Sequence, residues 1–365
     1  MALALTGCRI FTGDEFLDDH AVLISGRRIE SVVEQSKVAN SHEVINLNGG
    51  ILAPGFIDVQ VNGGGGALLN DKPTVETVKQ IVEAHRKFGT TGLLPTVITD
   101  SPEILSQAMT AVRLARRELP NILGLHIEGP FIDVAKKGAH DGSFIRAMTS
   151  ADVAQITSCD CGHVLVTVAP NVVSPQFIGD LTQAGVLVSL GHSDANFEQA
   201  NEALAAGASA FTHLFNAMSQ MNGREPGMVG AALSDKKSFI GIIADGFHVD
   251  YAAISIAKKI MQHRLFAITD AVTTTTEGYY QHQPDGDKYA AANILSGSAL
   301  TMYKALQNLV KHVGIETGEA LRMCSLYPAQ VMQMDDQLGM IASGYKAKMV
   351  LLPEGLNNKS IQVIG

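Results

Sequence analysis

Eight short apolar runs, separated by stretches of helical periodicity, constrain the fold more than any other feature of the sequence. The runs are GFIDVQV (55–61), GLLPTVI (92–98), ILGLHIE (122–128), VLVTVAP (164–170), VLVSLGH (186–192), AFTHLFN (210–216), FIGIIAD (239–245) and LFAITDA (265–271). Intervening stretches such as TVETVKQIVEAHRKFG place apolar residues at helical spacing. Buried strands joined by helical crossovers pair in parallel, which predicts a (β/α)8 TIM-like barrel. A doubly wound open sheet is the competing fold, but the nucleotide fingerprint that it needs is not found.

The two ends of the chain have a different texture. The first fifty residues alternate short apolar runs with turns, as in CRIFTG and AVLISGRRIESVV, and predict strands of a small β unit. The stretch DQLGMIASGYKAKMVLLP, from residue 336, returns to short strands and is expected to rejoin that unit. We therefore predict a small β-sandwich domain built from residues 1–53 and 336–365, with the barrel formed by residues 54–335.

Composition limits the classes of function. The chain has 365 residues, of which 46% are hydrophobic and 17% charged, so it can bury a large core. A net charge of -9 argues against general nucleic-acid binding, since an acidic chain repels the phosphate backbone. No apolar run approaches about 18 residues and the N-terminus has no basic segment, so neither a membrane span nor a signal peptide is expected. The scattered cysteines contain no CxxC pair and predict structural thiols in the cytoplasm: Cys8, Cys159, Cys161 and Cys324.

The first barrel strand ends in an unusual way, as APGFIDVQVNGGGG (53–66). A phosphate-binding loop of the GxxxxGK[ST] type is excluded because no Lys-Ser or Lys-Thr follows the glycines. A dinucleotide fingerprint is excluded because ALLNDKP (67–73) does not open a helix. The glycines are expected instead to permit a sharp turn or a close backbone approach at the barrel mouth.

The segment VTTTTEGYYQHQPDGDKYAAANIL (272–295) is long for a connection between a strand and a helix. Its Asp285–Gly286 pair predicts a hairpin. A lid or rim of the active site would suit this segment.

Ionisable side chains lie at the C-terminal ends of several predicted strands. They are Glu128, His192, His213, Asp245 with His248 just beyond it, and Asp270. In a barrel these ends open on one face, where catalytic groups gather. Each residue alone could be a cap or a satisfied buried polar group. Together, a Glu and two His form a standard set of ligands for a divalent metal, and an aspartate on another strand is a natural proton carrier. The pattern favours a metal-assisted hydrolase.

A series of motifs along the whole chain resembles the amidohydrolase superfamily and, within it, the N-acetylglucosamine-6-phosphate deacetylases. The motifs are APGFID, HIEGPF, LGHSDA, THLFNAM, GREPG, IADGFHVD, TDA, LSGSALTM and LGMIASGYKAKMVLL. The resemblance implies hydrolysis of the acetamide of N-acetyl-D-glucosamine 6-phosphate to D-glucosamine 6-phosphate and acetate, a step of amino-sugar catabolism. It also implies the barrel with a small β domain.

The family's metal ligands match Glu128, His192 and His213, and its general base, which later acts as general acid, matches Asp270. Zinc is the default ion for a Glu-His-His site, with iron, manganese and cobalt (Fe2+, Mn2+ or Co2+) as alternatives. The resemblance thus implies one divalent metal ion that activates the attacking water.

The family's substrate contacts also have counterparts. His140, in KKGAHDG, matches a histidine that contacts the acetamide carbonyl, and a lone histidine in such a polar loop is otherwise expected to be solvated. Asn216 and Ala217 match positions that touch the sugar phosphate, and Arg224 and His248 match the phosphate-binding pair. The resemblance implies that Arg224 reaches across from a neighbouring subunit, so a homodimer is expected.

Many amidohydrolases carry His-x-His at the end of the first strand, where it holds a second metal. Here that place reads Gln60-Val61-Asn62. A neutral amide oxygen is a far weaker ligand for zinc-like ions than an imidazole nitrogen, so the sequence predicts one metal rather than two. His126, two residues before Glu128, is expected to be a packed histidine on the opposite side of the strand.

Two other functions are compatible with parts of this sequence. Another amidohydrolase acting on a different amide or cyclic amide would share the barrel and the metal but need not have GREPG or ADGFH. A barrel kept as an assembly scaffold would be free to lose its ligands, yet Glu128, His192, His213 and Asp270 are all in place.

Overall fold

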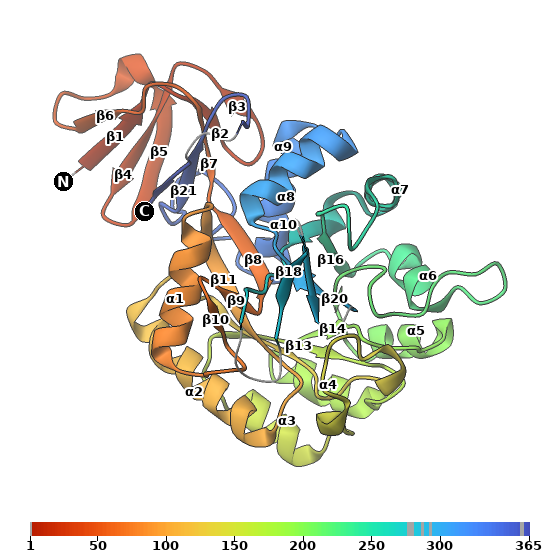
Figure 1. The fold of residues 1–365 in the computed structure, drawn as a ribbon. Coiled ribbons are helices and arrows are strands. Elements are labelled where there is room, and N and C mark those ends of the chain that lie inside the picture. The colour runs from red at the N-terminus through yellow and green to blue at the C-terminus, as the bar shows by residue number, and fades with distance from the viewer. Residues whose placement is uncertain (1, 276–280, 286–287, 292–293, 358–360) are drawn as a thin grey trace.

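The computed structural model describes residues 2–275, 281–285, 288–291, 294–357 and 361–365. Figure 1 shows a large body of strands and surrounding helices, with a smaller β unit beside it in which both chain ends lie. The predicted fold class, a (β/α)8 barrel with a small β domain, is confirmed.

All eight predicted barrel strands form one parallel sheet, in chain order. They are β8 (Phe56–Val61), β11 (Thr90–Ile98), β12 (Gly124–Glu128), β13 (His163–Val168), β14 (Leu187–Leu190), β15 (Ala210–Phe211), β16 (Phe239–Ile243) and β17 (Leu265–Ile268). β15 is much shorter than the run AFTHLFN indicates. His213 and Phe215 have φ values of 35° and 75°, and such left-handed residues cannot continue a strand.

The seam between β8 and β17 is closed by side-chain and backbone bonds rather than by a regular ladder. Thr269 donates its hydroxyl to Asp58 Oδ2 at 2.6 Å, and Asp270 N donates to Gln60 O at 2.9 Å. Asn62 N donates to Ala271 O at 3.0 Å. These bonds fix the ends of the first and last barrel strands side by side.

Helices cover the outside of the barrel (Figure 1). They are α1 (Val75–Arg86), α2 (Pro102–Glu118), α3 (Ser150–Thr157), α4 (Pro175–Gln183), α5 (Phe197–Ala205), α6 (Gly227–Ser234), α7 (Tyr251–Met261), α8 (Met302–Asn308), α9 (Thr317–Cys324) and α10 (Leu326–Val331). Short turns follow several of them or fill loops: η1 (Gln35–Lys37), η2 (Val134–Lys136), η3 (Gly142–Phe144), η4 (Gln262–Arg264) and η5 (Leu309–Val313). Helix starts are marked by side-chain caps such as Thr74 before α1 and Ser101 before α2, each accepting a backbone N–H.

The small β unit has two sheets that share an apolar core. One sheet has the order β5 (Arg28–Glu34), β4 (His20–Ser25), β1 (Ala2–Thr6), β6 (Glu43–Asn46), and the other has the order β22 (Gln362–Ile364), β21 (Met349–Leu352), β7 (Ile51–Pro54), β2 (Arg9–Phe11), β3 (Phe16–Leu17). Leu5 and Val22 of the first sheet pack with Ile10, Leu52 and Met349 of the second. Because β21 pairs with β7, both ends of the chain build this sandwich, as predicted. The tail differs in one respect, since residues 336–347 are irregular apart from an isolated bridge of Lys346 with Arg28, and only Met349–Leu352 forms a strand in that stretch.

The four glycines form a hairpin at the barrel mouth. β9 (Gly63–Gly64) pairs with β10 (Ala67–Leu68), and the turn residues Gly65 and Gly66 have φ values of 64° and 87°. Two successive positive φ values are typical of a type I′ turn. A Cβ on Gly64 would lie 2.9 Å from His85 Nε2 of α1, so the hairpin rests directly on that helix. Sharp turning and close approach thus explain the glycines.

The long segment after β17 forms a three-stranded antiparallel sheet of β18 (Gln283–Asp285), β19 (Lys288–Ala291) and β20 (Ile294–Ser298). β18 and β19 pair with Asp285 opposite Lys288, which bears out the predicted hairpin; residues 286–287 at its turn lie outside the described residues. Leu295, Ser296 and Gly297 line the cavity described below, so the segment forms part of its rim.

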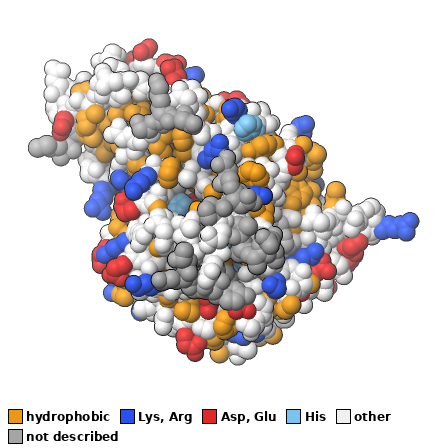
Figure 2. All heavy atoms as spheres, viewed as in Figure 1, with side chains coloured by type: hydrophobic (Ala, Val, Ile, Leu, Met, Phe, Trp, Pro, Cys, Tyr) orange, Lys and Arg blue, Asp and Glu red, His pale blue; other side chains and the backbone are white. Residues whose placement is uncertain are grey.

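The surface carries mixed charge. On the face shown in Figure 2, the described Lys and Arg side chains are interspersed with Asp and Glu side chains. All four cysteines are free, and Cys161 and Cys324 are buried. In the part of the chain that the structure describes, no helix combines the length and the apolarity needed to cross a membrane.

Candidate active site

A cavity of about 460 Å³ opens at the C-terminal ends of the barrel strands. All but one of the predicted site residues line it: Glu128, His140, His192, His213, Asn216, Ala217, His248 and Asp270. Arg224 does not line it. The barrel therefore brings together residues that are up to 142 positions apart, between Glu128 and Asp270.

Three ligand-type atoms converge on one point of the cavity floor. Nε2 of His192 and Nε2 of His213 each lie 3.1 Å from Glu128 Oε1, and the two nitrogens lie 3.0 Å apart. All three side chains are at least nine-tenths buried. Ligands held about 2.0–2.1 Å from a tetrahedral zinc ion lie about 3.3 Å apart, close to these separations.

The position of the proton on His192 shows that this group of side chains suits a cation. His192 Nδ1 lies 2.9 Å from Lys136 O, and a carbonyl accepts only, so Nδ1 carries the proton. In the neutral ring, Nε2 then points a lone pair at a carboxylate oxygen and at a second imidazole. Lone pairs repel one another unless a proton or a metal ion lies between them, and a backbone carbonyl on Nδ1 is the usual partner of a metal-binding histidine.

The pKa values of His213 and Glu128 are shifted in opposite directions by their contact. Burial alone would lower the pKa of His213, but its contact with Glu128 outweighs burial and raises it. Burial alone would raise the pKa of Glu128, but His192 and His213 hold it well below its usual range. A divalent cation would displace these protons, so metal binding is expected to release protons.

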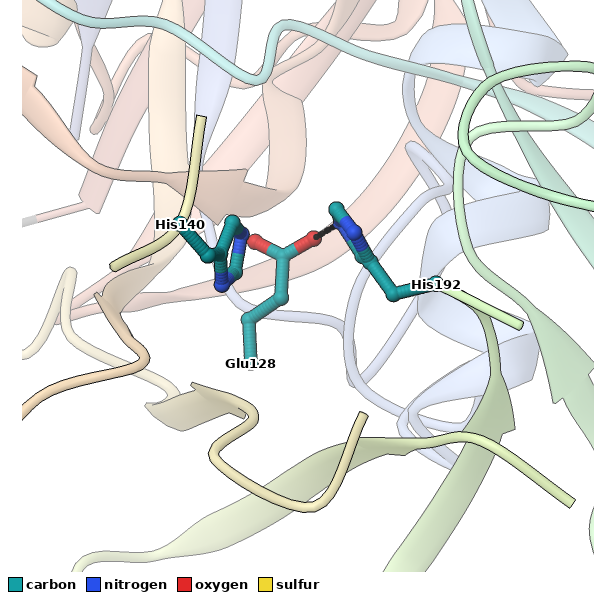
Figure 3. Close-up of side chains that lie close together, drawn as sticks. All are labelled: Glu128, His140 and His192. Atoms are coloured by element: carbon teal, nitrogen blue, oxygen red, sulfur yellow. Dashed lines mark hydrogen bonds and ion pairs between the residues drawn. The ribbon is translucent and has the colours of Figure 1, made fainter. Parts of the chain in front are cut away.

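A second combination of ligands includes His140. Ligand atoms of Glu128, His140 and His192 lie within 4.8 Å of one another, and Figure 3 shows both rings beside the carboxylate. The ring centroids of His140 and His192 are 4.4 Å apart. Because the set with His213 is tighter, at 3.0–3.1 Å, it is the better candidate for the metal, and His140 is left facing the cavity beside it.

Asp270 lies next to this cluster and is held by two amides. Asn62 Nδ2 donates to Asp270 Oδ1 at 2.6 Å, and Gln60 Nε2 donates to the same oxygen at 3.2 Å. Gln60 Nε2 also donates to both oxygens of Glu128 at 3.0 Å. Burial, with a smaller contribution from the charge of Glu128, raises the pKa of Asp270 to about 6. Such a carboxylate can both take up and release a proton near neutral pH.

Three of these residues have backbone conformations that are rare outside glycine. The φ values are 47° for His192, 35° for His213 and 50° for Asp270. Each left-handed residue of this kind costs about 1–3 kcal/mol, and such residues cluster at functional sites. The strain turns each side chain inward where its strand ends.

His140 is not solvated, although its loop is polar. It is 5% exposed, and its Nδ1 lies 2.8 Å from Thr99 Oγ1. Burial, and then the nearby His192, hold the pKa of His140 well below its usual range, so the ring is neutral. If the Thr99 hydroxyl donates to Nδ1, the Nε2–H is directed to another acceptor.

Asp245 orients His248. The sequence predicts Asp245 at a strand end but assigns it no role. Asp245 Oδ2 lies 2.6 Å from His248 Nδ1, and both side chains are almost fully buried. Asp245 Oδ1 also accepts from the backbone N–H groups of Phe247 and His248 at 2.8 Å. The i, i+3 spacing of Asp245 and His248 in ADGFHVD was the signal for this pair.

Arg224 lies outside the cavity of its own chain. It is exposed, in the segment before α6, and no ion pair or hydrogen bond of its guanidinium occurs within the described residues. In Figure 1 the loop that precedes α6 reaches away from the barrel.

The prediction for His126 is wrong in one respect. Residues i and i+2 of a strand point to the same face, so His126 lies on the inner side with Glu128, one layer deeper in the barrel. There it lies 2.8 Å from Thr167 Oγ1 and shares a small interior space with Gln60. Burial lowers its pKa to about 4, so it is a packed neutral histidine, as expected.

Comparison with known proteins identifies the family. The family model described as "Amidohydrolase family" matches residues 51–364, and the "NagA composite domain" matches residues 3–52. The chain belongs to the amidohydrolase family. Within this family it is 37% identical to an N-acetylglucosamine-6-phosphate deacetylase of Haemophilus influenzae, over 100% of the chain and 97% of that protein.

Other amidohydrolases give a similar result. An N-acetylgalactosamine-6-phosphate deacetylase of a Shewanella strain is 38% identical over 87% of the chain and 83% of that protein. The crystal structure of N-acetylglucosamine-6-phosphate deacetylase from Pasteurella multocida superposes with a TM-score of 0.94 at 34% identity, over all of both chains. The resemblance to this group of deacetylases, inferred from the motifs, is confirmed.

Replacing one histidine at a time distinguishes the two possible ligand sets. We expect His213→Asn to lower the affinity for a divalent metal by about 100-fold or more, since even the loss of a ligand's hydrogen-bond partner costs 10–100-fold. His140→Asn, the matched control, is expected to retain the metal and lose activity. The metal content of both variants is measured after dialysis. A His140→Asn protein without metal, together with a His213→Asn protein that retains it, would reverse the assignment.

Proposed function

We propose that the protein hydrolyses the acetamide of N-acetyl-D-glucosamine 6-phosphate to D-glucosamine 6-phosphate and acetate. The observation that carries this proposal is the convergence of Glu128, His192 and His213 on one point beside Asp270, in the cavity that His140 and His248 also line. The names of the relatives give the substrate class, and the site provides the groups that the reaction needs.

The metal-binding residues in this proposal are Glu128, His192 and His213, and the ion is zinc. When bound, it would polarise the acetyl carbonyl and lower the pKa of water towards about 7. One ion per chain is proposed because Gln60 and Asn62 direct amide N–H groups, which cannot bind a cation, at the neighbouring carboxylates.

Asp270 acts twice in the proposed reaction. It takes a proton from the attacking water and returns this proton to the sugar nitrogen as the C–N bond breaks, because an amine is a poor leaving group unless protonated. Its raised pKa of about 6 suits both steps. Asn62 and Gln60 hold the carboxylate in place through Oδ1, so that Oδ2 is the oxygen left to carry the proton.

His140 stabilises the oxyanion that develops on the acetyl carbonyl. The neutral ring, with Nδ1 bonded to the Thr99 hydroxyl, directs its Nε2–H towards the cavity. A donor that is already oriented and buried requires no rearrangement as the charge forms.

The phosphate binds at the opposite side of the substrate from the acetamide. His248, fixed through Nδ1 by Asp245, offers Nε2 to the cavity, which Asn216 and Ala217 also line. Arg224 completes the phosphate site from a second copy of the chain, since it lies outside the cavity of its own copy. The working form in this proposal is a homodimer.

Two further points belong to the proposal. The barrel spans residues 54–335 and the small domain residues 1–53 and 336–365, which is supported by the pairing of β7 with β21. The protein works in the cytoplasm, where sugar phosphates are retained by their charge and the four free thiols stay reduced.

N-acetyl-D-galactosamine 6-phosphate is a second candidate substrate. The Shewanella relative named for that sugar is as similar, at 38% identity, as the Haemophilus influenzae relative, at 37%. The two sugars differ only in the orientation of one hydroxyl. The same reacting groups can therefore hydrolyse the acetamide of either sugar.

Release of acetate from three sugars tests the proposal directly. We expect metal-loaded protein to hydrolyse N-acetylglucosamine 6-phosphate with a kcat/KM about 100-fold or more above that for N-acetylglucosamine, because two charge-assisted bonds to the phosphate are lost. The kcat/KM for N-acetylgalactosamine 6-phosphate shows how the second candidate substrate compares with the first. Equal rates with and without phosphate would contradict the phosphate site. No acetate from any of them, with metal bound, would indicate another amide substrate.

Mixing two inactive variants tests the shared site. Arg224→Ala and Asp270→Asn are each expected to be nearly inactive alone. In dimers formed from equal amounts of both, about a quarter of wild-type activity should return, since half of the dimers are mixed and each holds one complete site. Dimers that are shown to be mixed, by two affinity tags, but remain inactive would place Arg224 outside the partner's site.

A further inference from the structure

One polar atom of the cavity floor has no partner. Asn62 lines the cavity and is 7% exposed, and its Oδ1 is buried without a hydrogen bond to any described residue. A buried amide oxygen in this state is unfavourable, because it has given up its hydrogen bonds to water without replacement. Among the cavity-lining residues that the structure describes, only His213 Nδ1 shares this condition.

The orientation of the Asn62 amide is fixed by its surroundings. Its backbone N–H donates to Ala271 O at 3.0 Å, and its Nδ2 donates to Asp270 Oδ1 at 2.6 Å. Exchanging the two amide atoms would set Oδ1 against a carboxylate oxygen at that distance, with no proton between them. Oδ1 is therefore the atom directed away from Asp270.

The unpaired oxygen lies close to the group that carries the proton in the proposed reaction. The nitrogen and oxygen of one amide are about 2.3 Å apart. Together with the 2.6 Å bond to Asp270, this places Asn62 Oδ1 within about 5 Å of the Asp270 carboxylate. The leaving nitrogen must approach Asp270 to be protonated, which brings its own hydrogen towards Asn62.

We propose that Asn62 Oδ1 accepts a hydrogen bond from the N–H of the substrate's acetamide. The inference rests on the proposed deacetylase function. Water oxygen bonds to the acetyl carbon, the C–N bond breaks, and the proton from water passes through Asp270 to nitrogen. The original hydrogen of the amide stays on nitrogen and donates to Asn62 Oδ1. As nitrogen gains positive charge, this bond becomes charge-assisted and strengthens, so it favours the transition state over the bound substrate.

An ester substrate separates this role from the positioning of Asp270. The 2-O-acetyl ester of glucose 6-phosphate has oxygen in place of the N–H and offers Asn62 nothing to accept. Loss of the bond to Asp270 in Asn62→Leu affects both substrates, whereas loss of the acceptor affects the amide alone. We expect kcat/KM to fall about tenfold or more further for the amide than for the ester.

The ratio of kcat/KM for the amide to kcat/KM for the ester is measured within one preparation, so an unfolded fraction cancels. Asn62→Ala serves as the second variant. Asn70→Leu is the matched control, because both amide atoms of Asn70 are already bonded, to Ile98 and Asp100, and the amide-to-ester ratio should stay that of the wild type.

Equal losses on both substrates, or complete loss on both, would overturn the inference. A wild-type protein that hydrolyses neither phosphorylated N-acetyl sugar would instead remove the proposed function, and this inference with it.

Discussion

The seam between β8 and β17 is the constraint on which the site depends. Thr269 bonds to Asp58 across it, and a little further along Asp270 N bonds to Gln60 O. The burial of Asp58 raises its pKa to about 7, so the seam holds a buried carboxyl group with an unusually high pKa. Closing the barrel here places Asp270 beside the amides of Gln60 and Asn62 at the end of the first strand.

The amides of Gln60 and Asn62 also explain how two carboxylates remain close. Glu128 and Asp270 both receive hydrogen bonds from the single Nε2 of Gln60. Two carboxylates at this separation repel each other, and a cation is one way to offset the repulsion. Here the neutral donor Gln60 Nε2 lies between them. The pKa of Asp270 is nevertheless raised, first by burial and then by the charge of Glu128, which leaves Asp270 able to hold a proton.

The sequence predicted the barrel, the sandwich from both chain ends and the residues that converge in the cavity, because strand ends of a barrel share one face regardless of their distance in the chain. It could not predict that β15 stops at Phe211, since the left-handed backbone of His213 and Phe215 is imposed by the site. It also missed the bond from Asp245 to His248 and the unpaired oxygen of Asn62. These depend on side-chain contacts that spacing alone does not fix. The direction assigned to His126 was wrong for a different reason, since residues two apart in a strand point to the same face.

The proposed site holds one cation between Glu128, His192 and His213, beside Asp270. Anomalous scattering at the zinc edge, from crystals of zinc-loaded protein, shows where the cation lies. We expect one peak per chain, bounded by the Glu128 carboxylate and Nε2 of both histidines, with Gln60 and Asn62 outside its coordination. A second peak beside Gln60 and Asn62, or a single peak bounded by His140 instead of His213, would contradict it.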